Sequence, residues 1–150
     1  MLLPSPILVV CTGNLCRSPF AEHVLRRKLE HADVYAEVFS RGLQDVGSQP
    51  VPHTAQLVAA EFGVDLSTHR SAQLSPQDMQ RAALAWVMTS RQRKHIGQLN
   101  PTGIGKVFLL SQPSDDSDIA DPVGQPADVF RDVYSEINDY IDAWLPRFGI

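Results

Sequence analysis

The chain has 150 residues, of which 43% are hydrophobic and 20% charged, and its formal net charge is −4. This composition is typical of one globular domain, and it excludes a disordered chain or a coiled coil. A negative net charge argues against general nucleic-acid binding, and no apolar segment approaches the length that crosses a membrane. We therefore expect neither a nucleic acid nor a membrane as partner, and any phosphate site must be positive locally.

The start of the chain and its two cysteines bear on location. Residues 1–4 lack basic side chains and lead straight into an apolar run, so no signal peptide is expected. Cys11 and Cys16 lie close together in one short segment, which makes a disulfide framework improbable. The sequence therefore favours a cytoplasmic protein whose thiols stay reduced.

The first half of the chain alternates between strand and helix patterns. Residues 7–10 are apolar without alternation, as in a central strand covered on both faces. Pro19 suits the first turn of a helix that runs to about Glu30. Residues 34–39 alternate loosely and predict a second strand, and residues 52–62 predict a second helix.

The second half continues the alternation and ends on a long amphipathic helix. The expected elements are a short helix at 76–81, a strand at 84–88, a basic helix at 90–99, a strand at 106–110 and a helix at 127–145, with an acidic loop at 111–126. Strands that alternate with helices predict an α/β domain with a doubly wound parallel sheet and helices on both faces. In such sheets ligands bind beyond the carboxyl ends of the strands.

A cysteine and an arginine frame the loop after the first strand. Cys11 follows the apolar run directly, five residues separate it from Arg17, and Pro19 opens the helix. At such a junction backbone N–H groups converge on an anion, and a guanidinium can close the ring with a bidentate fork. The same positive field favours the thiolate of Cys11 and makes it a nucleophile. This arrangement fits attack of sulfur on a phosphate ester, which gives a phosphocysteine that water then hydrolyses.

The whole segment resembles the signature Cys-x-Gly-Asn-x-Cys-Arg-Ser-Pro of the low-molecular-weight protein tyrosine phosphatase family. Every fixed position matches, and the loop would comprise Thr12, Gly13, Asn14, Leu15, Cys16, Arg17 and Ser18. The resemblance covers essentially all of residues 1–150 and implies a single domain with a four-stranded, flavodoxin-like sheet. It also implies hydrolysis of phosphotyrosine in proteins without metal or cofactor. Because many bacterial relatives act on autophosphorylated tyrosine kinases, such a kinase is one expected partner.

The loop residues have individual expected roles. Arg17 would bind the phosphate and stabilise transition-state charge. Ser18 either caps the helix or donates to the Cys11 thiolate. Gly13 lets the backbone approach the ligand and is a candidate for a positive φ. Cys16 either packs or, by the family resemblance, forms a reversible disulfide with Cys11.

The resemblance also assigns supporting residues and a general acid. In the family, the loop asparagine (Asn14 here) tolerates a left-handed backbone and holds the loop through hydrogen bonds to a serine and a histidine, which resemble Ser40 and His69. A leaving phenolate needs a proton, and Asp121, followed by Pro122, resembles the family's general acid. Proline restricts the aspartate backbone to extended conformations. The other carboxylates of the loop, Asp115, Asp116 and Asp118, are expected to be solvated.

Several other functions fit parts of the pattern. A protein-arginine phosphatase resembles this family but carries threonine where Leu15 stands, and the apolar leucine favours an aromatic ester. Arsenate reductase needs further cysteines downstream, and none follows Cys16. A metal site is disfavoured because two cysteines without nearby histidines cannot complete a tetrahedron. Since Val123 stands where many members have an aromatic wall, specificity is expected to depend on Leu15 and Arg41. A non-catalytic phosphate-binding module is the alternative from a different class.

Overall fold

The computed structural model describes residues 3–150, so the expectation for the start of the chain lies partly outside the described residues. In chain order the elements are β1 (Ile7–Cys11), α1 (Arg17–His31), β2 (Val38–Gly42), α2 (His53–Glu61), α3 (Pro76–Arg81), β3 (Leu84–Val87), α4 (Ser90–Leu99), η1 (Pro101–Lys106), β4 (Val107–Leu109), α5 (Ala127–Trp144) and η2 (Leu145–Phe148). The four strands are all parallel and lie in the order β2-β1-β3-β4. The predicted doubly wound, flavodoxin-like α/β sheet is confirmed.

Strand β1 has no polar face because it is buried on both sides. Val9 belongs to one apolar cluster together with side chains of α1 and α5, whereas Leu8 and Val10 belong to a second cluster with side chains of α3 and α4. Successive side chains of a strand point to opposite faces, so both faces of β1 must be apolar. This explains the unbroken apolar run in the sequence.

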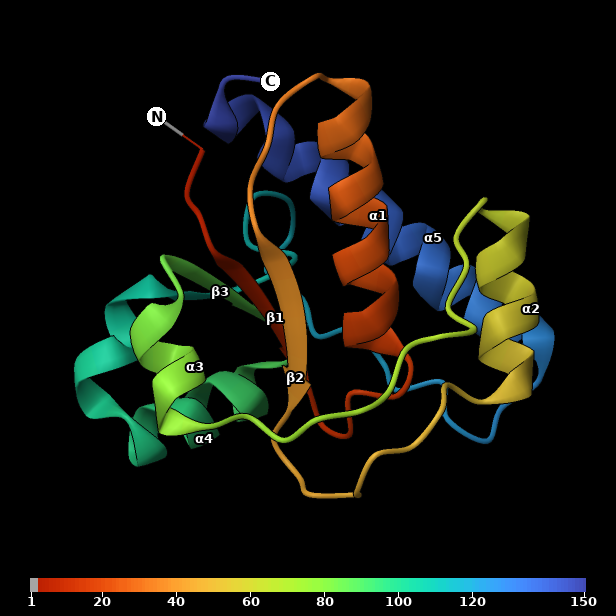
Figure 1. Ribbon diagram of the computed structural model, residues 1–150, viewed down its shortest axis with the longest axis horizontal. Coiled ribbons are helices and arrows are strands. Elements are labelled where there is room, and N and C mark those ends of the chain that lie inside the picture. Colours follow the sequence, from red (N-terminus) through yellow and green to blue (C-terminus); the bar gives the residue numbers. More distant parts are fainter. Residues whose placement is uncertain (1–2) are drawn as a thin grey trace.

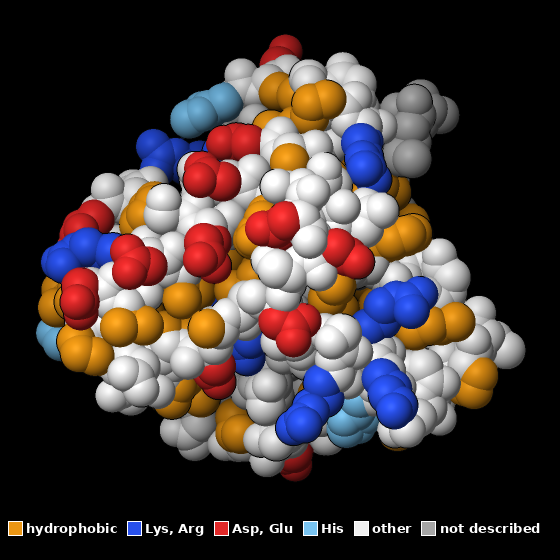
Figure 2. All heavy atoms as spheres, turned by 180° about the vertical axis from the view of Figure 1, so that it is seen from behind, with side chains coloured by type: hydrophobic (Ala, Val, Ile, Leu, Met, Phe, Trp, Pro, Cys, Tyr) orange, Lys and Arg blue, Asp and Glu red, His pale blue; other side chains and the backbone are white. Residues whose placement is uncertain are grey.

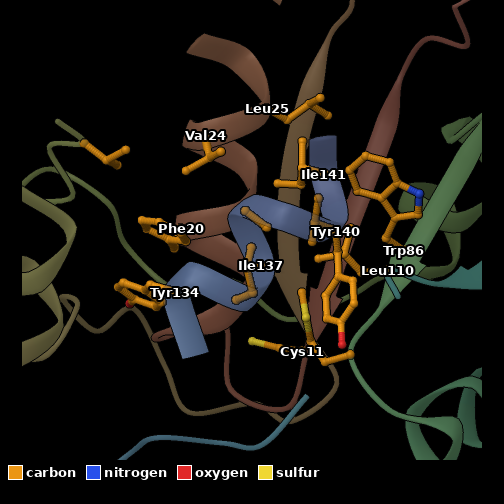
Figure 3. Close-up of a cluster of buried hydrophobic side chains, with 14 of the residues drawn as sticks. Cys11, Phe20, Val24, Leu25, Trp86, Leu110, Tyr134, Ile137, Tyr140 and Ile141 are labelled. Carbon is orange, nitrogen blue, oxygen red and sulfur yellow. The ribbon is translucent and has the colours of Figure 1, made fainter. Parts of the chain in front are cut away.

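The helices form two layers around the sheet (Figure 1). Helices α1, α2 and α5 cover one face, and α3 and α4 cover the other. The larger cluster contains both tryptophans, Trp86 and Trp144, whose ring centroids lie 5.3 Å apart. Figure 3 shows Cys11 at one end of this cluster, where β1 meets the loop that follows it.

Some predicted boundaries are wrong. The second strand was expected at 34–39 but comprises Val38–Gly42, and the side chain of Tyr35 is 85% exposed. Pairing of β2 with β1 starts at Val38, opposite Ile7, so the preceding residues only connect α1 to the sheet. Helix α1 begins at Arg17, two residues before Pro19, so Pro19 lies in the first turn as predicted. The 3₁₀ turns η1 and η2 had no predicted counterpart, because short turns carry little periodic signal.

The charge of the surface is uneven. Figure 2, the view from behind, shows acidic side chains spread over the left and middle of this face and a group of Lys and Arg at the lower right. The exposed acidic residues of α5 are Asp128, Asp132, Glu136, Asp139 and Asp142.

No helix within residues 3–150 is long and apolar enough to cross a membrane.

Candidate active site

Cys11 lies where a parallel sheet presents ligand sites. It is the last residue of β1, and β1 pairs with β2 on one side and with β3 on the other. The carboxyl ends of the strands flank a crevice at such a reversal of strand order. The sulfur of Cys11 is buried and lies 3.0 Å from the hydroxyl oxygen of Ser18, which belongs to the first turn of α1.

The side-chain amide of Asn14 sets the direction of the Ser18 hydroxyl. Asn14 Nδ2 donates to Ser18 Oγ at 2.8 Å and to Ser40 Oγ at 3.0 Å. Asn14 Oδ1 accepts from the backbone N–H of Ala72 at 3.1 Å, so the two ends of the amide cannot be exchanged. Because Ser18 Oγ accepts from Asn14, its own hydrogen is free to donate to the sulfur of Cys11. The N-cap residue of α1 is Cys16, and Ser18 lies within the helix, so Ser18 is no helix cap.

The backbone of Asn14 is left-handed and is held by His69. Its φ is 57°, a conformation that asparagine tolerates better than most residues. His69 Nε2 lies 3.1 Å from the Asn14 carbonyl oxygen, which can only accept, so the ring donates from Nε2. Burial lowers the pKa of His69 and favours the neutral ring. The positive φ suggested for Gly13 is wrong, since the left-handed residue of the loop is its neighbour Asn14.

A buried carboxylate, Glu22, ends this chain of hydrogen bonds and was missed in the sequence. The hydroxyl of Ser40 donates to Glu22 Oε1 at 2.6 Å, and Arg26 pairs with Glu22 Oε2 at 2.6 Å. Glu22 lies one helical turn after Ser18 on α1, on the buried side of the helix. In the sequence Glu22 stands out only as an acidic residue beside apolar ones. That pattern does not show that it would bond to Ser40.

The guanidinium of Arg17 is buried although it carries a full charge. Arg17 is 3% exposed, and its Nη1 donates to the backbone oxygen of Ile119 at 2.8 Å. Its Nη2 lies 3.5 Å from Asp121 Oδ2 and 3.5 Å from Thr12 Oγ1. A buried cation is costly unless it is paired. The structure thus brings the predicted arginine and aspartate together, with the aspartate side chain 46% exposed at the edge of the site.

Asp115 and Asp118 are exposed, as expected for solvated loop residues, and each also accepts hydrogen bonds that anchor the loop. Asp115 accepts hydrogen bonds from Ser117 and from the hydroxyl of Tyr140 on α5, and these bonds lower the pKa of Asp115. Asp118 Oδ1 accepts from the backbone N–H of Ser90 at 2.8 Å, at the first residue of α4. Both contacts fix the loop that carries Asp121.

Cys16 differs from Cys11 in its surroundings. Burial, with smaller contributions from the neighbouring Cys11 and Asp121, raises the pKa of Cys16 to about 12. Its thiol therefore stays protonated near neutral pH. The hydroxyl of Tyr134 on α5 donates to the Cys16 carbonyl at 3.0 Å, and the Tyr134 ring stacks on Phe20 (Figure 3). Both cysteines are free thiols.

The amides of the loop remain available to a ligand. Within residues 3–150, no backbone hydrogen bond outside the helices and strands has an N–H of residues 13–16 as its donor.

Leu15 is half-buried and packs against the larger apolar cluster. The guanidinium of Arg41 is paired with Asp78 at 3.1 Å, so its charge is already balanced. No group of three His, Cys, Asp or Glu side chains in the described part of the chain is placed to hold a metal ion.

Gly42, at the end of β2, lies against the loop and was also missed. A Cβ at this position would come within 2.8 Å of the Gly13 carbonyl carbon and 2.9 Å of the Asn14 nitrogen. Neither backbone atom can move without shifting the loop. Only glycine allows the two segments to approach this closely.

Comparisons with known proteins identify relatives along almost the whole chain. The family model for low molecular weight phosphotyrosine protein phosphatase matches residues 6–149. A probable low molecular weight protein-tyrosine-phosphatase, EpsP, of Ralstonia nicotianae is 38% identical over 141 residues, 94% of each chain. A protein-arginine-phosphatase of Geobacillus stearothermophilus is 38% identical over 143 residues, 93% of each chain. The crystal structure of the Erwinia amylovora tyrosine phosphatase AmsI superposes with a TM-score of 0.90 at 30% identity, covering 99% of this chain and 95% of that one.

We predict that Gly42→Ala lowers kcat/KM by at least about tenfold, because the new methyl group displaces the loop backbone. The measurement is steady-state hydrolysis of an aryl phosphate. Gly105→Ala is the matched control, since a Cβ there meets nothing within 4 Å. Equal activity of the two variants would contradict the close packing of Gly42 against the loop.

A second prediction concerns pH and Cys16. An exposed thiol titrates near about 8.5, whereas the folded pKa of Cys16 is raised to about 12. Above the lower value the unfolded chain releases a proton that the folded chain retains. The free energy of unfolding therefore falls as pH rises, by up to about 1.4 kcal/mol per pH unit. Urea unfolding between about pH 8 and about pH 10 should show a flatter pH dependence for Cys16→Ala than for wild type. Parallel curves would refute it.

Proposed function

Because this chain belongs to the low molecular weight phosphotyrosine protein phosphatase family, we propose that Cys11 is the nucleophile with which it hydrolyses phosphotyrosine in proteins. The enzyme is a protein-tyrosine-phosphatase. One observation carries the assignment of Cys11: its sulfur lies 3.0 Å from the Ser18 hydroxyl, at the foot of a loop that includes a buried arginine. That hydroxyl has a hydrogen free for a thiolate, and Cys16 has no comparable donor to its sulfur among residues 3–150.

In the first half-reaction the Cys11 thiolate attacks phosphorus, and the bond from phosphorus to the tyrosine oxygen breaks. The electron pair of that bond goes to the phenolic oxygen, which takes a proton from the Asp121 carboxyl group. Arg17 and the loop N–H groups hold the three other oxygens and stabilise the charge that spreads over them. The products are the phosphocysteine at Cys11 and the dephosphorylated tyrosine side chain of the substrate protein.

In the second half-reaction water attacks the phosphocysteine. The Asp121 carboxylate takes a proton from that water, and the bond between sulfur and phosphorus breaks. Ser18 donates to the departing thiolate and so makes it a better leaving group. Asn14, Ser40 and His69 contact no reacting atom in this scheme, because they act by holding the loop and the Ser18 hydroxyl.

The test of this function is hydrolysis of an aryl phosphate in the presence of a chelator. Reduced wild-type protein should turn over, and Cys11→Ser should not. Turnover that survives the substitution would exclude covalent catalysis through Cys11. A folded, reduced wild-type protein that binds phosphate but never hydrolyses the ester would be a phosphate-binding module.

A protein-arginine phosphatase is the second candidate, and the 38% identical Geobacillus enzyme is the observation that favours it. The apolar side chain of Leu15 favours an aromatic ester over a charged guanidinium. A panel of phosphotyrosine, phosphoserine and phosphoarginine peptides separates the two candidates.

We propose that the protein partner includes an autophosphorylated tyrosine kinase and that the enzyme works in the reducing cytoplasm, where a catalytic thiol persists.

We predict that the cost of Asp121→Asn depends on the leaving group. A phenol-like leaving group needs the proton, so kcat/KM should fall by about 100-fold or more for phenyl phosphate. An acidic nitrophenol leaves without full protonation and should lose much less. Asp116→Asn, the same change of charge in the same loop, should preserve activity on both substrates. Equal losses on both substrates would remove Asp121 from the role of acid.

A further inference from the structure

Gln92 lies outside the loop motif, yet its side chain joins the loop to the sheet. It is on the first turn of α4 and only 4% exposed. Its Oε1 accepts from the backbone N–H groups of Met88 at 2.8 Å and Thr89 at 3.1 Å. Its Nε2 donates to Thr12 Oγ1 at 3.1 Å. The carbonyl end is thus occupied by two donors, which fixes the amino end toward Thr12.

This contact determines what the Thr12 hydroxyl can do. Thr12 Oγ1 accepts from Gln92 and also lies 3.5 Å from Arg17 Nη2, which can only donate. Since both neighbours are donors, the hydroxyl hydrogen must point away from them. The same Arg17 nitrogen lies 3.5 Å from Asp121 Oδ2, so the hydroxyl is beside the phosphate-binding and acid groups.

The junction between β3 and α4 also holds the loop of residues 111–126, which carries Asp121 and is called the acid loop below. The backbone N–H of Ile119 donates to the Met88 carbonyl at 2.9 Å, and the Ile119 carbonyl accepts from Arg17. Two residues before Gln92, the N–H of Ser90 donates to Asp118. The segment of residues 88–92 therefore contacts the acid loop on one side of the site and the phosphate-binding loop on the other. Gln92 makes the contact with the phosphate-binding loop, at Thr12.

We propose that Gln92 is a positioning residue for phosphoryl transfer. It keeps the Thr12 hydroxyl turned so that its hydrogen is donated to an oxygen of the bound phosphoryl group, beside Arg17. This inference rests on the proposed reaction at Cys11. It assigns Gln92 no contact with the substrate.

A double-mutant cycle between the two residues tests the inference. Gln92→Glu keeps the acceptor for Met88 and Thr89 but has no hydrogen for Thr12, so the hydroxyl must turn its own hydrogen to the new carboxylate. Thr12→Val removes the hydroxyl, and Thr12→Ser retains it. Each of the first two changes should lower kcat/KM for an aryl phosphate by about tenfold, and Thr12→Ser, which keeps the hydroxyl, should lose less than Thr12→Val.

The double variant carrying Gln92→Glu and Thr12→Val should be no worse than either single variant, because both act through one hydroxyl. Gln98→Glu, an exposed position on the same helix, is the control for added charge and should keep wild-type activity. If Gln92→Glu fails to fold, Gln92→Met, which is neutral and similar in length, replaces it in the cycle. The proposal would be overturned if the losses of the two single variants multiplied in the double variant, or if Thr12→Val kept full activity. An inactive wild type would instead contradict the proposed function.

Discussion

The active-site loop depends on the hydrogen bonds of one buried side chain, that of Asn14. Its amide donates to Ser18 and Ser40 and accepts from the N–H of Ala72, while its own carbonyl accepts from His69. Each of these groups would cost about 1–3 kcal/mol if it were left buried without a partner. The Asn14 backbone that makes these four bonds is left-handed, so one residue holds both the curl of the loop and the direction of the Ser18 hydroxyl. The proposed reactivity of Cys11 follows from that direction.

The charge of the site is local, as the acidic composition of the chain requires. Arg17 is buried in a protein of net charge −4, and its guanidinium has three partners within residues 3–150: a backbone carbonyl, a hydroxyl and a half-exposed carboxylate. Such weak compensation leaves the guanidinium able to accept a dianionic group. The N–H groups of residues 13–16, which have no backbone acceptor in the described part of the chain, add to this positive potential. The acid loop is tied at Tyr140 and at the start of α4, so Asp121 approaches this field from a fixed direction.

The sequence was sufficient to predict the fold and to single out the loop motif, because both can be read from local patterns. Strand–helix alternation predicts the doubly wound sheet, and the segment from Cys11 to Pro19 carries the proposed chemistry within a few residues. The start of β2 was misplaced, since it is set by pairing with β1 rather than by local alternation. Glu22, Gly42 and Gln92 could not be found either. Each acts on the site through a partner distant in sequence or through a backbone approach that no periodicity encodes.

The central claim is that the sulfur of Cys11 takes the phosphoryl group from the substrate. Acid quenching of the enzyme during turnover of an aryl phosphate, followed by peptide mass spectrometry, tests it most directly. The account predicts a phosphoryl group on the peptide that contains Cys11 and Cys16, with fragmentation placing it on Cys11. A phosphoryl group on Cys16 or on another residue would contradict it, as would turnover in which no phosphoenzyme forms even when hydrolysis of the intermediate is made rate-limiting.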